Sequence, residues 1–329
     1  MNERPKIVIL DGYTINPGDN PWTPVEALGD CTIYDRTPPE LRVERAQDAE
    51  IVLTSKVKLD QPTLAALPKL RYISMLATGY NNVDVVAAGG LGISVANVPA
   101  YSTESVVQTT FALLLELAVH VGLHDAAVKA GEWVRSPDHS FWKTPIVELD
   151  GLTLGIVGYG TIGRAVARVA SAFGMEVIAH APRIPEEPGA VPVRFVSREE
   201  LFATADVVSL NCPQTPENSG FVNAGLLSVM KPSAFFINVA RGGLVNEADL
   251  AAALNDGIIA GAGLDVVAHE PMLPDNPLLG APNCIFTPHI AWASLAARRR
   301  LMEIVAANVA SFLAGAPMNV VNGPYLSPV

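Results

Sequence analysis

A glycine-rich loop with the sequence Gly158-Tyr159-Gly160-Thr161-Ile162-Gly163 constrains the fold more than any other feature of the chain. The loop follows an apolar run of strand character, Leu152–Val157, and opens a segment with helical periodicity. A GxGxxG pattern between a strand and a helix is typical of dinucleotide-binding units, in which the glycines permit a tight turn, a close approach of the pyrophosphate and helix packing. We therefore predict a dinucleotide site at all six loop residues, Gly158, Tyr159, Gly160, Thr161, Ile162 and Gly163. Glycines in a turn without a ligand are the alternative.

Short apolar runs alternate with helical segments along the whole chain. The runs before residue 100 are Lys6–Leu10, Ile51–Thr54, Arg71–Leu76 and Ile93–Ala96, and those after it are Leu152–Val157, Glu176–Ala179, Val207–Leu210, Ala234–Val239, Ile259–Leu264 and Cys284–Phe286. Strands that alternate with helices imply parallel sheets with right-handed crossovers. With 329 residues, two domains are expected. The predicted fold class is α/β, with two Rossmann-like, doubly wound parallel-sheet domains.

Two long apolar helices suggest how the domains are connected. One is expected from about Ser102 to His124, and the other from Ser294 to Phe312. The second would carry the chain back to the first domain. We predict a discontinuous substrate domain, residues 1–100 and 292–329, with the dinucleotide-binding domain, residues 101–291, inserted into it.

Composition excludes several functional classes. Half of the residues are hydrophobic and 17% are charged, which indicates a well-buried globular protein. The net charge of -11 and the lack of a basic stripe argue against nucleic-acid binding, and Arg298-Arg299-Arg300 is expected to form a solvated helix face. No run reaches membrane-spanning length and no signal peptide is recognised, so a cytoplasmic protein without a membrane partner is expected. The three cysteines lie far apart, without a CxxC or metal-ligand spacing, which predicts buried thiols and no metal.

Three polar residues follow strand-like runs behind the glycine loop, namely Arg241, Glu270 and His289. An arginine can hold a carboxylate with two parallel hydrogen bonds, and a histidine can pass a proton near neutral pH. We predict that Arg241 binds a substrate carboxylate, that His289 protonates a carbonyl oxygen, and that Glu270 orients His289 and favours its charged form. Each residue also has a purely structural alternative: a surface ion pair for Arg241, a buried histidine for His289 and a turn residue for Glu270.

The strand after the glycine loop bears on the choice of dinucleotide. An acidic residue usually ends this strand and holds the ribose diol, but Ala181 stands where it belongs, with Arg183 two residues later. Loss of the carboxylate removes repulsion of a 2′-phosphate, and an arginine can bind that phosphate. We therefore favour NADP over NAD. The alternative is that Arg183 points to solvent and NAD is used.

The chain resembles the D-isomer-specific 2-hydroxyacid dehydrogenase family over almost its whole length. The matching segments are Ala77–Asp84, the glycine loop, Val239–Gly243, Gly263–Val266, Glu270-Pro271 and Thr287–His289. Within the family, Leu10–Asp19, Tyr101–Val106 and His289–Ser294 are most similar to glycerate dehydrogenases, also called hydroxypyruvate reductases.

The resemblance implies more than the residues do alone. It implies the roles given above for Arg241, Glu270 and His289, and a homodimer joined largely through the helix after Tyr101 and the dinucleotide-binding domain. It implies that Ala77, Thr78 and Gly79 bind the substrate carboxylate, shared with Arg241, and that Trp292 flanks the substrate or the nicotinamide. Further cofactor contacts that it implies are Thr110, Cys212, Pro213, Val239 and Asp265, the last holding the nicotinamide amide.

The leading functional hypothesis is reduction of hydroxypyruvate or glyoxylate to D-glycerate or glycolate with NADPH or NADH. Other small acids remain open within the same class, including another 2-keto acid, formate or phosphite. A nucleotide-sensing regulator of the corepressor type is the alternative from a different class, because a fold does not by itself determine function. Turnover with a keto acid separates the two classes.

Overall fold

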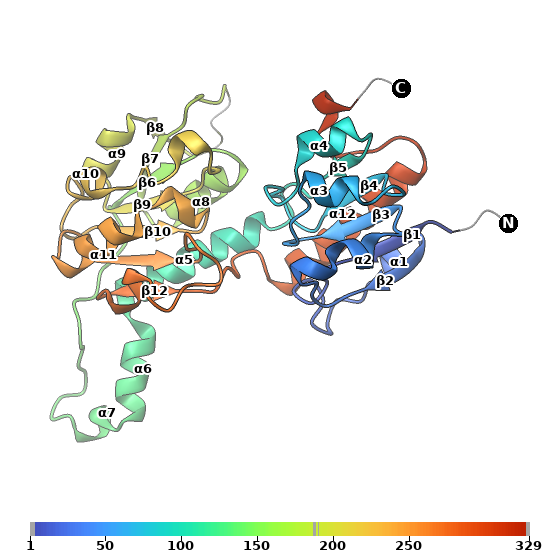
Figure 1. Ribbon diagram of the computed structural model, residues 1–329. Coiled ribbons are helices and arrows are strands. Elements are labelled where there is room, and N and C mark those ends of the chain that lie inside the picture. The colour runs from blue at the N-terminus through green and yellow to red at the C-terminus, as the bar shows by residue number, and fades with distance from the viewer. Residues whose placement is uncertain (1–3, 187–188, 190, 327–329) are drawn as a thin grey trace. The chain divides into compact units, whose positions relative to one another are not determined.

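The computed structural model describes residues 4–186, 189 and 191–326. The chain divides into two compact units, with unit 1 comprising Met1–Ser102 and Ala293–Val329, and unit 2 comprising Thr103–Trp292. Each unit contains its own parallel sheet with helices around it (Figure 1). Unit 2 is inserted into unit 1 along the chain. The predicted fold class is confirmed.

Unit 1 contains a five-stranded parallel sheet in the order β2-β1-β3-β4-β5, a known doubly wound order. Its strands are β1 (Lys6–Ile9), β2 (Asp30–Ile33), β3 (Ile51–Thr54), β4 (Tyr72–Met75) and β5 (Ser94–Ala96). Its helices are α1 (Thr23–Glu26), α2 (Arg42–Ala46), α3 (Gln61–Ala65), α4 (Val85–Gly90) and α12 (Leu295–Leu313), with the 3₁₀ turns η1 (Pro39–Leu41) and η5 (Gly323–Tyr325). The sequence did not predict β2, because this edge strand is only partly buried and has no continuous apolar run.

Arg298 corrects one expectation for unit 1. It is only 7% exposed, and its guanidinium donates from both terminal nitrogens to the carboxylate of Asp19, at 2.5 and 2.7 Å. The bonded guanidinium lowers the pKa of the Asp19 carboxyl. The first arginine of the basic run therefore ties α12 to the loop after β1, rather than forming part of a solvated face.

Unit 2 contains a seven-stranded parallel sheet in the order β12-β11-β10-β9-β6-β7-β8. Its strands are β6 (Thr153–Val157), β7 (Glu176–His180), β8 (Arg194–Phe195), β9 (Val207–Leu210), β10 (Phe235–Asn238), β11 (Gly261–Leu264) and β12 (Cys284–Phe286). Six strands were expected here. The missing one, β8, has only two residues and carries too short an apolar pattern to be recognised.

The helices of unit 2 cover its sheet and extend from it. They are α5 (Thr103–Val119), α6 (Val121–Lys129), α7 (Glu132–Arg135), α8 (Thr161–Ala172), α9 (Arg198–Thr204), α10 (Ala224–Leu227) and α11 (Glu247–Asn255). The 3₁₀ turns are η2 (Pro216–Asn218), η3 (Gly242–Leu244) and η4 (Pro277–Gly280).

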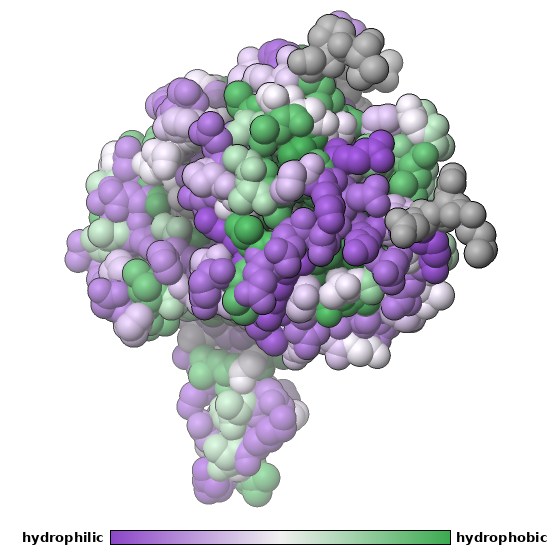
Figure 2. Space-filling view, turned by 45° about the vertical axis from the view of Figure 1, so that its right-hand side comes forward, coloured by the Kyte–Doolittle hydropathy of each residue, from purple (hydrophilic) through white to green (hydrophobic). Residues whose placement is uncertain are grey.

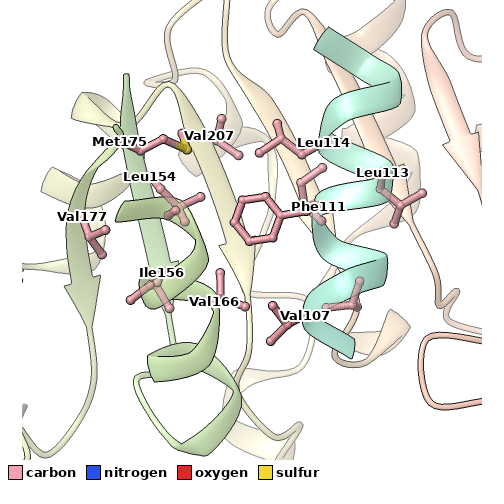
Figure 3. Close-up of a cluster of buried hydrophobic side chains, with 14 of the residues drawn as sticks. Val107, Phe111, Leu113, Leu114, Leu154, Ile156, Val166, Met175, Val177 and Val207 are labelled. Atoms are coloured by element: carbon pink, nitrogen blue, oxygen red, sulfur yellow. The ribbon is translucent and has the colours of Figure 1, made fainter. Parts of the chain in front are cut away.

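The core of unit 2 is built where α5 packs on the sheet. Val107, Phe111 and Leu114 of α5 lie in one buried cluster with Leu154 of β6 and Val207 of β9 (Figure 3). All five side chains are at most 6% exposed. Burying an aliphatic or aromatic side chain of this size contributes about 1.5–3 kcal/mol, so this face provides a rigid base for the loops at the strand ends.

The helix expected to run from Ser102 to about His124 is interrupted. α5 ends at Val119, His120 adopts a left-handed conformation with φ of 51°, and α6 continues after a bend of 56°. The carboxylate of Glu116 accepts a hydrogen bond from the Gly122 N–H at 3.2 Å and so stabilises the new helix start. In the described residues, no single helix is long and apolar enough to cross a membrane, although α5 and α6 together pass that test, and α5 is largely buried in the core.

Residues 121–148, which we call the arm, project from the sheet of unit 2 (Figure 1). The arm contains α6, α7 and the chain that returns to β6. Apolar side chains lie among hydrophilic ones on its surface (Figure 2), and Trp133, Val134 and Trp142 are 52%, 89% and 68% exposed. The arm therefore presents apolar area that its own chain does not cover.

Candidate active site

The glycine loop connects β6 to α8, and two of its glycines are required by packing. Gly158 has φ of 96°, and a Cβ there would lie 2.7 Å from backbone atoms of both Asn211 and Cys212. A Cβ on Gly163 would overlap the carbonyl oxygen of Gly158. The turn therefore fits tightly against the loop after β9 and against its own helix.

Gly160 is different, because a Cβ there would meet no atom within 4 Å. Packing therefore does not explain this glycine. It is the N-cap of α8, and no side chain caps the N-terminal N–H groups of this helix. Open space in front of a helix N-terminus suits a close-lying anion such as a pyrophosphate, so the loop fits the dinucleotide that its sequence predicts.

The other residues expected to contact the cofactor occupy two kinds of position. Tyr159 is 5% exposed with its ring edge-on to Phe195 at 5.3 Å, and Thr110 and Val239 are 1% and 8% exposed. Ile162 is partly buried against the same core, whereas Thr161, in the first turn of α8, is exposed. For the buried residues, any contact with a ligand would depend mainly on backbone atoms. Their cofactor contacts stay predictions.

Two more predicted cofactor residues lie after β9. The half-buried Cys212 adjoins Gly158, and Pro213 next to it is exposed. Burial raises the pKa of the Cys212 thiol to about 11, so the group is neutral near pH 7. A neutral surface at this position would not repel a bound anion.

The adenosine end of the predicted site follows β7. The Gly158 N–H donates to the carbonyl oxygen of His180, the last residue of β7, at 2.8 Å. Ala181 is half-buried directly after the strand, and Arg183 is exposed. No carboxylate occupies positions 181–183, which fits a site that does not repel a 2′-phosphate.

Arg241 lies three residues after β10, in a turn held by Asn238. The Asn238 amide donates to the carbonyl oxygen of Arg241 at 2.9 Å and accepts from the Ala240 N–H at 3.0 Å. Asn238 is 1% exposed, whereas the Arg241 side chain is exposed. A buried amide thus fixes the backbone from which the exposed guanidinium extends. No pattern in the sequence predicted these two hydrogen bonds of Asn238.

His289 and Glu270 form a close pair. The His289 Nδ1 lies 2.6 Å from Oε2 of Glu270, and the two side chains are 26% and 31% exposed. With Nδ1 directed at the carboxylate, Nε2 is the nitrogen left to exchange a proton. His269, the other histidine nearby, instead places Nδ1 2.9 Å from the Pro271 carbonyl oxygen. Of these two histidines, His289 is therefore the one whose Nδ1 faces the Glu270 carboxylate, and its role in proton transfer stays a prediction.

Asp265 holds the backbone that carries His289. It is 2% exposed, and its carboxylate accepts hydrogen bonds from Thr287 Oγ1 at 2.6 Å, from the Ile290 N–H at 2.9 Å and from the Ala291 N–H at 3.0 Å. His289 has φ of 54°, which is unfavourable for a residue with a side chain. The buried carboxylate offsets this cost. Its predicted contact with the nicotinamide amide stays a prediction.

The parallel sheet of unit 2 places the predicted catalytic residues and the glycine loop at one edge. β10, β11 and β12 are adjacent and parallel, with Asn238 aligned with Leu264 and Leu264 aligned with Phe286. Arg241, Asp265 and His289 therefore follow the carboxyl ends of neighbouring strands. The glycine loop follows β6 at the same edge, separated from β10 only by β9. Ligands of open parallel sheets bind at this edge.

The residues expected to bind substrate lie partly in unit 1. Ala77, Thr78 and Gly79 follow β4, where Thr78 Oγ1 donates to the Val98 carbonyl oxygen at 2.7 Å. The Asn97 amide donates to the Thr78 carbonyl oxygen, also at 2.7 Å. Both bonds join the turn to residues 97 and 98, which follow β5. Trp292 is half-buried at the end of unit 2, and these substrate contacts stay predictions.

Residues 111–291 match the family described as D-isomer specific 2-hydroxyacid dehydrogenase, NAD binding domain. The chain belongs to this family. It is 48% identical over 324 residues to a hydroxypyruvate reductase of Blautia hydrogenotrophica, an alignment that covers 96% of this chain and 99% of that protein. It is 42% identical over 285 residues to a glycerate dehydrogenase of Methylorubrum extorquens, covering 86% and 88%.

Solved structures of the family agree. An NADPH-dependent glyoxylate/hydroxypyruvate reductase from Sinorhizobium meliloti, in complex with NADP and malonate, is 29% identical with a TM-score of 0.85 and covers 99% of this chain and 100% of that one. D-lactate dehydrogenase from Aquifex aeolicus, complexed with NAD and lactic acid, has the same identity and TM-score, covering 97% and 99%. The chain is an NAD(P)-dependent 2-hydroxyacid dehydrogenase. In its described part, no group of three or more His, Cys, Asp or Glu residues is arranged to hold a metal ion.

Proposed function

We propose that this dehydrogenase reduces hydroxypyruvate and glyoxylate to D-glycerate and glycolate. The observation that carries the proposal is the 2.6 Å contact between His289 and Glu270, at the same sheet edge as Arg241 and the glycine loop. Relatives named hydroxypyruvate reductase, glycerate dehydrogenase and glyoxylate reductase support the choice of substrates.

Arg241 binds the substrate carboxylate in this proposal. Its guanidinium is exposed, and its backbone is fixed by Asn238. A planar guanidinium can bind a carboxylate with two parallel hydrogen bonds, which orients the substrate as well as attracting it. From the resemblance, we extend the carboxylate site to backbone N–H groups around Thr78 and Gly79, and we assign Trp292 to the flank of the substrate.

His289 is the general acid of the proposed reduction. Its Nε2 donates a proton to the carbonyl oxygen of the keto acid as the carbonyl carbon accepts a hydride. Glu270 accepts from Nδ1, which fixes the orientation of the ring and leaves Nε2 to carry the proton that is donated. A bound nicotinamide dinucleotide supplies the hydride. In the oxidation direction, neutral His289 takes the proton back.

The glycine loop and its surroundings hold the dinucleotide, and we propose that NADPH is preferred over NADH. Gly160 and the N-terminus of α8 accommodate the pyrophosphate. Ala181 in place of an acid, with Arg183 two residues on, favours a 2′-phosphate. Asp265, Val239, Thr110, Cys212 and Pro213 are further contacts that the resemblance suggests.

We propose that the protein is a homodimer and that the arm is part of its interface. An exposed aromatic and aliphatic surface of this kind marks a contact with another protein. Trp142 is 68% exposed and is not packed in the core of its own unit. Because the family resemblance implies a homodimer, we favour a second copy of the chain as the partner that covers it. The three free cysteines suit a reducing compartment, and we propose the cytoplasm.

Initial rates with hydroxypyruvate and with glyoxylate, each with NADPH and with NADH, test the proposal. Fast turnover of hydroxypyruvate with NADPH preferred supports the substrate and the cofactor assignments together. A preference for NADH overturns only the cofactor assignment. Turnover of another 2-keto acid, formate or phosphite alone replaces the substrate. Dinucleotide binding without turnover of any of these acids favours the regulator.

Light scattering of the purified chain tests the dimer. The wild-type protein is expected to have twice the mass of the chain, and the substitutions Val134→Asp and Trp142→Ser are expected to yield a folded monomer. A wild-type monomer overturns the proposed assembly. The exposed Val86→Asp in unit 1 provides a matched control outside the arm.

A further inference from the structure

Glu247, the first residue of α11, has both carboxylate oxygens bonded to the segment that carries Glu270. Its Oε1 accepts from the Ala268 N–H at 2.7 Å, and its Oε2 accepts from the Asn276 Nδ2 at 2.9 Å. The two donors lie on either side of Glu270 in sequence. Glu247 therefore holds the segment 268–276 at both ends.

The middle of this segment is not held by burial. Residues 268–271 and 273–275 are exposed, so burial of apolar side chains contributes little to their position. Asn276, by contrast, is 9% exposed, and its Oδ1 accepts from the Leu278 N–H at 3.0 Å. This bond orients the amide so that Nδ2 points its donors at Glu247. The donors and acceptors are therefore fixed: the Glu247 carboxylate accepts both hydrogen bonds, and the Ala268 N–H and the Asn276 amide donate them.

The same part of the chain also carries Arg241. Glu247 begins α11 six residues after Arg241, and the η3 turn lies between them. A Cβ on Gly242 would overlap backbone atoms of Val267, so the Arg241 turn and the start of the 268–276 segment are in close backbone contact. Glu247 is placed to fix the position of Glu270 relative to Arg241.

We propose that Glu247 is a positioning residue for the reaction described above. It acts through Glu270, which it holds in place to bond His289 Nδ1. The inference rests on the proposed function only for its kinetic consequences, because the geometric part concerns Glu270 and His289 alone. Hydrogen bonds to a carboxylate are about twice as strong as neutral ones, so their loss leaves the exposed segment free to relax.

Three variants test whether the hydrogen bonds of Glu247 hold the 268–276 segment. Glu247→Ala removes both acceptors. Glu247→Gln keeps one acceptor but turns a donor towards Asn276 Nδ2, and Asn276→Asp in the same chain converts that clash into a hydrogen bond of reversed polarity with the net charge restored. We expect kcat to fall about 10-fold in Glu247→Ala, to fall less in Glu247→Gln, and to recover in the double variant.

Asp249→Ala is the matched control. Asp249 also lies in the first turn of α11, and its Oδ2 accepts from the Ala224 N–H at 2.9 Å, but it does not bond the 268–276 segment. Its loss removes a comparable long-range bond from the same helix. We expect Asp249→Ala to lower Tm without changing kcat or the His289 signals.

The decisive readout is the set of imidazole nitrogen NMR signals of His289. We expect the dinucleotide affinity of Glu247→Ala to stay within about 2-fold of wild type, because the glycine loop is untouched. The signal of the Nδ1 proton bonded to Glu270 should weaken or shift in that variant and return in the double variant.

An unchanged His289 signal in folded Glu247→Ala overturns the proposal, whether or not a substrate is known. If Glu247→Ala does not fold, the comparison of Glu247→Gln with the double variant decides, and equal His289 signals in those two proteins overturn it. A wild-type protein that reduces neither keto acid refutes the proposed function alone, because the NMR comparison requires no turnover.

Discussion

Two turns at the same edge of the unit 2 sheet reach a left-handed backbone conformation by different means. Gly158 adopts φ of 96° because it has no side chain, and the turn needs no outside support for this. His289 adopts φ of 54° although it has a side chain, because the Asp265 carboxylate binds the backbone beyond it. The first turn is encoded locally, whereas the second depends on a residue 24 positions away.

The difference between the two turns suits their proposed tasks, which are phosphate binding for the glycine loop and proton transfer for His289. A ligand phosphate needs bare backbone, which glycine supplies. Proton transfer needs a side chain, so the residue cannot be glycine and the strained backbone must be held by its surroundings. The dinucleotide turn can therefore be recognised from a short motif, whereas the His289 turn is stabilised by contacts that no short motif contains.

Removal of the His289 side chain should have the largest effect. We expect His289→Ala to lower kcat about 10²–10⁴-fold with dinucleotide binding retained, because only proton transfer is lost. Steady-state kinetics and fluorescence titration with NADPH measure the two quantities. A rate equal to that of wild type would remove His289 from the mechanism and leave the second turn without a function.

Gly158 and Gly160 of the glycine loop are expected to differ in what an added methyl group disturbs. Gly158→Ala should cost about 1–3 kcal/mol of folding free energy or more, because its φ and its contact with Asn211 and Cys212 both oppose a Cβ. Gly160→Ala should leave stability within about 0.5 kcal/mol but weaken dinucleotide binding, because only the ligand would meet the new methyl group. Urea denaturation and NADPH titration separate the two effects, and equal stability losses would contradict this assignment.

The support of the His289 turn is tested by Asp265→Asn. The amide presents a donor to N–H groups that the carboxylate now accepts from, so we expect a loss of about 1.5–3 kcal/mol in the free energy of unfolding. A fall in kcat of about 10-fold or more should accompany it as His289 moves. A stable protein with normal kcat would show that the turn keeps its conformation without the carboxylate.

Arg241→Lys tests whether the site requires the planar guanidinium of Arg241 or only its positive charge. Lysine retains the charge but not the two parallel donors, so we expect kcat/KM for hydroxypyruvate to fall about 10–100-fold. Kinetics near those of wild type would indicate that Arg241 does not bind the substrate carboxylate.

The smallest effect is expected at the adenosine end. Ala181→Asp should shift the ratio of kcat/KM for NADH over NADPH upwards by about 10-fold, because a carboxylate can accept from the ribose diol and repels a 2′-phosphate. The ratio of initial rates at subsaturating cofactor measures the shift. An unchanged ratio would mean that the end of β7 does not contact the ribose.

The fold class could be read from the sequence because buried parallel strands are continuous apolar runs and the GxGxxG turn lies between a strand and a helix. β2 and β8 were missed, because one is half-exposed and the other has two residues. The single helix expected to reach His124 was wrong, since the bend at His120 is stabilised by Glu116 binding the Gly122 N–H. Local periodicity does not contain that contact.

Sequence alone was enough to predict the two α/β sheets, the dinucleotide turn and the three polar residues behind it, because each depends on residues close together in the chain. The tertiary structure decided that Nδ1 of His289 faces Glu270, that Asn238 fixes the Arg241 turn, that Asp265 holds a strained backbone and that Glu247 holds both ends of the Glu270 segment. These are hydrogen bonds between groups brought together at strand ends. Their donors and acceptors have no pattern in sequence, because the sheet, and not the spacing of residues along the chain, makes them neighbours.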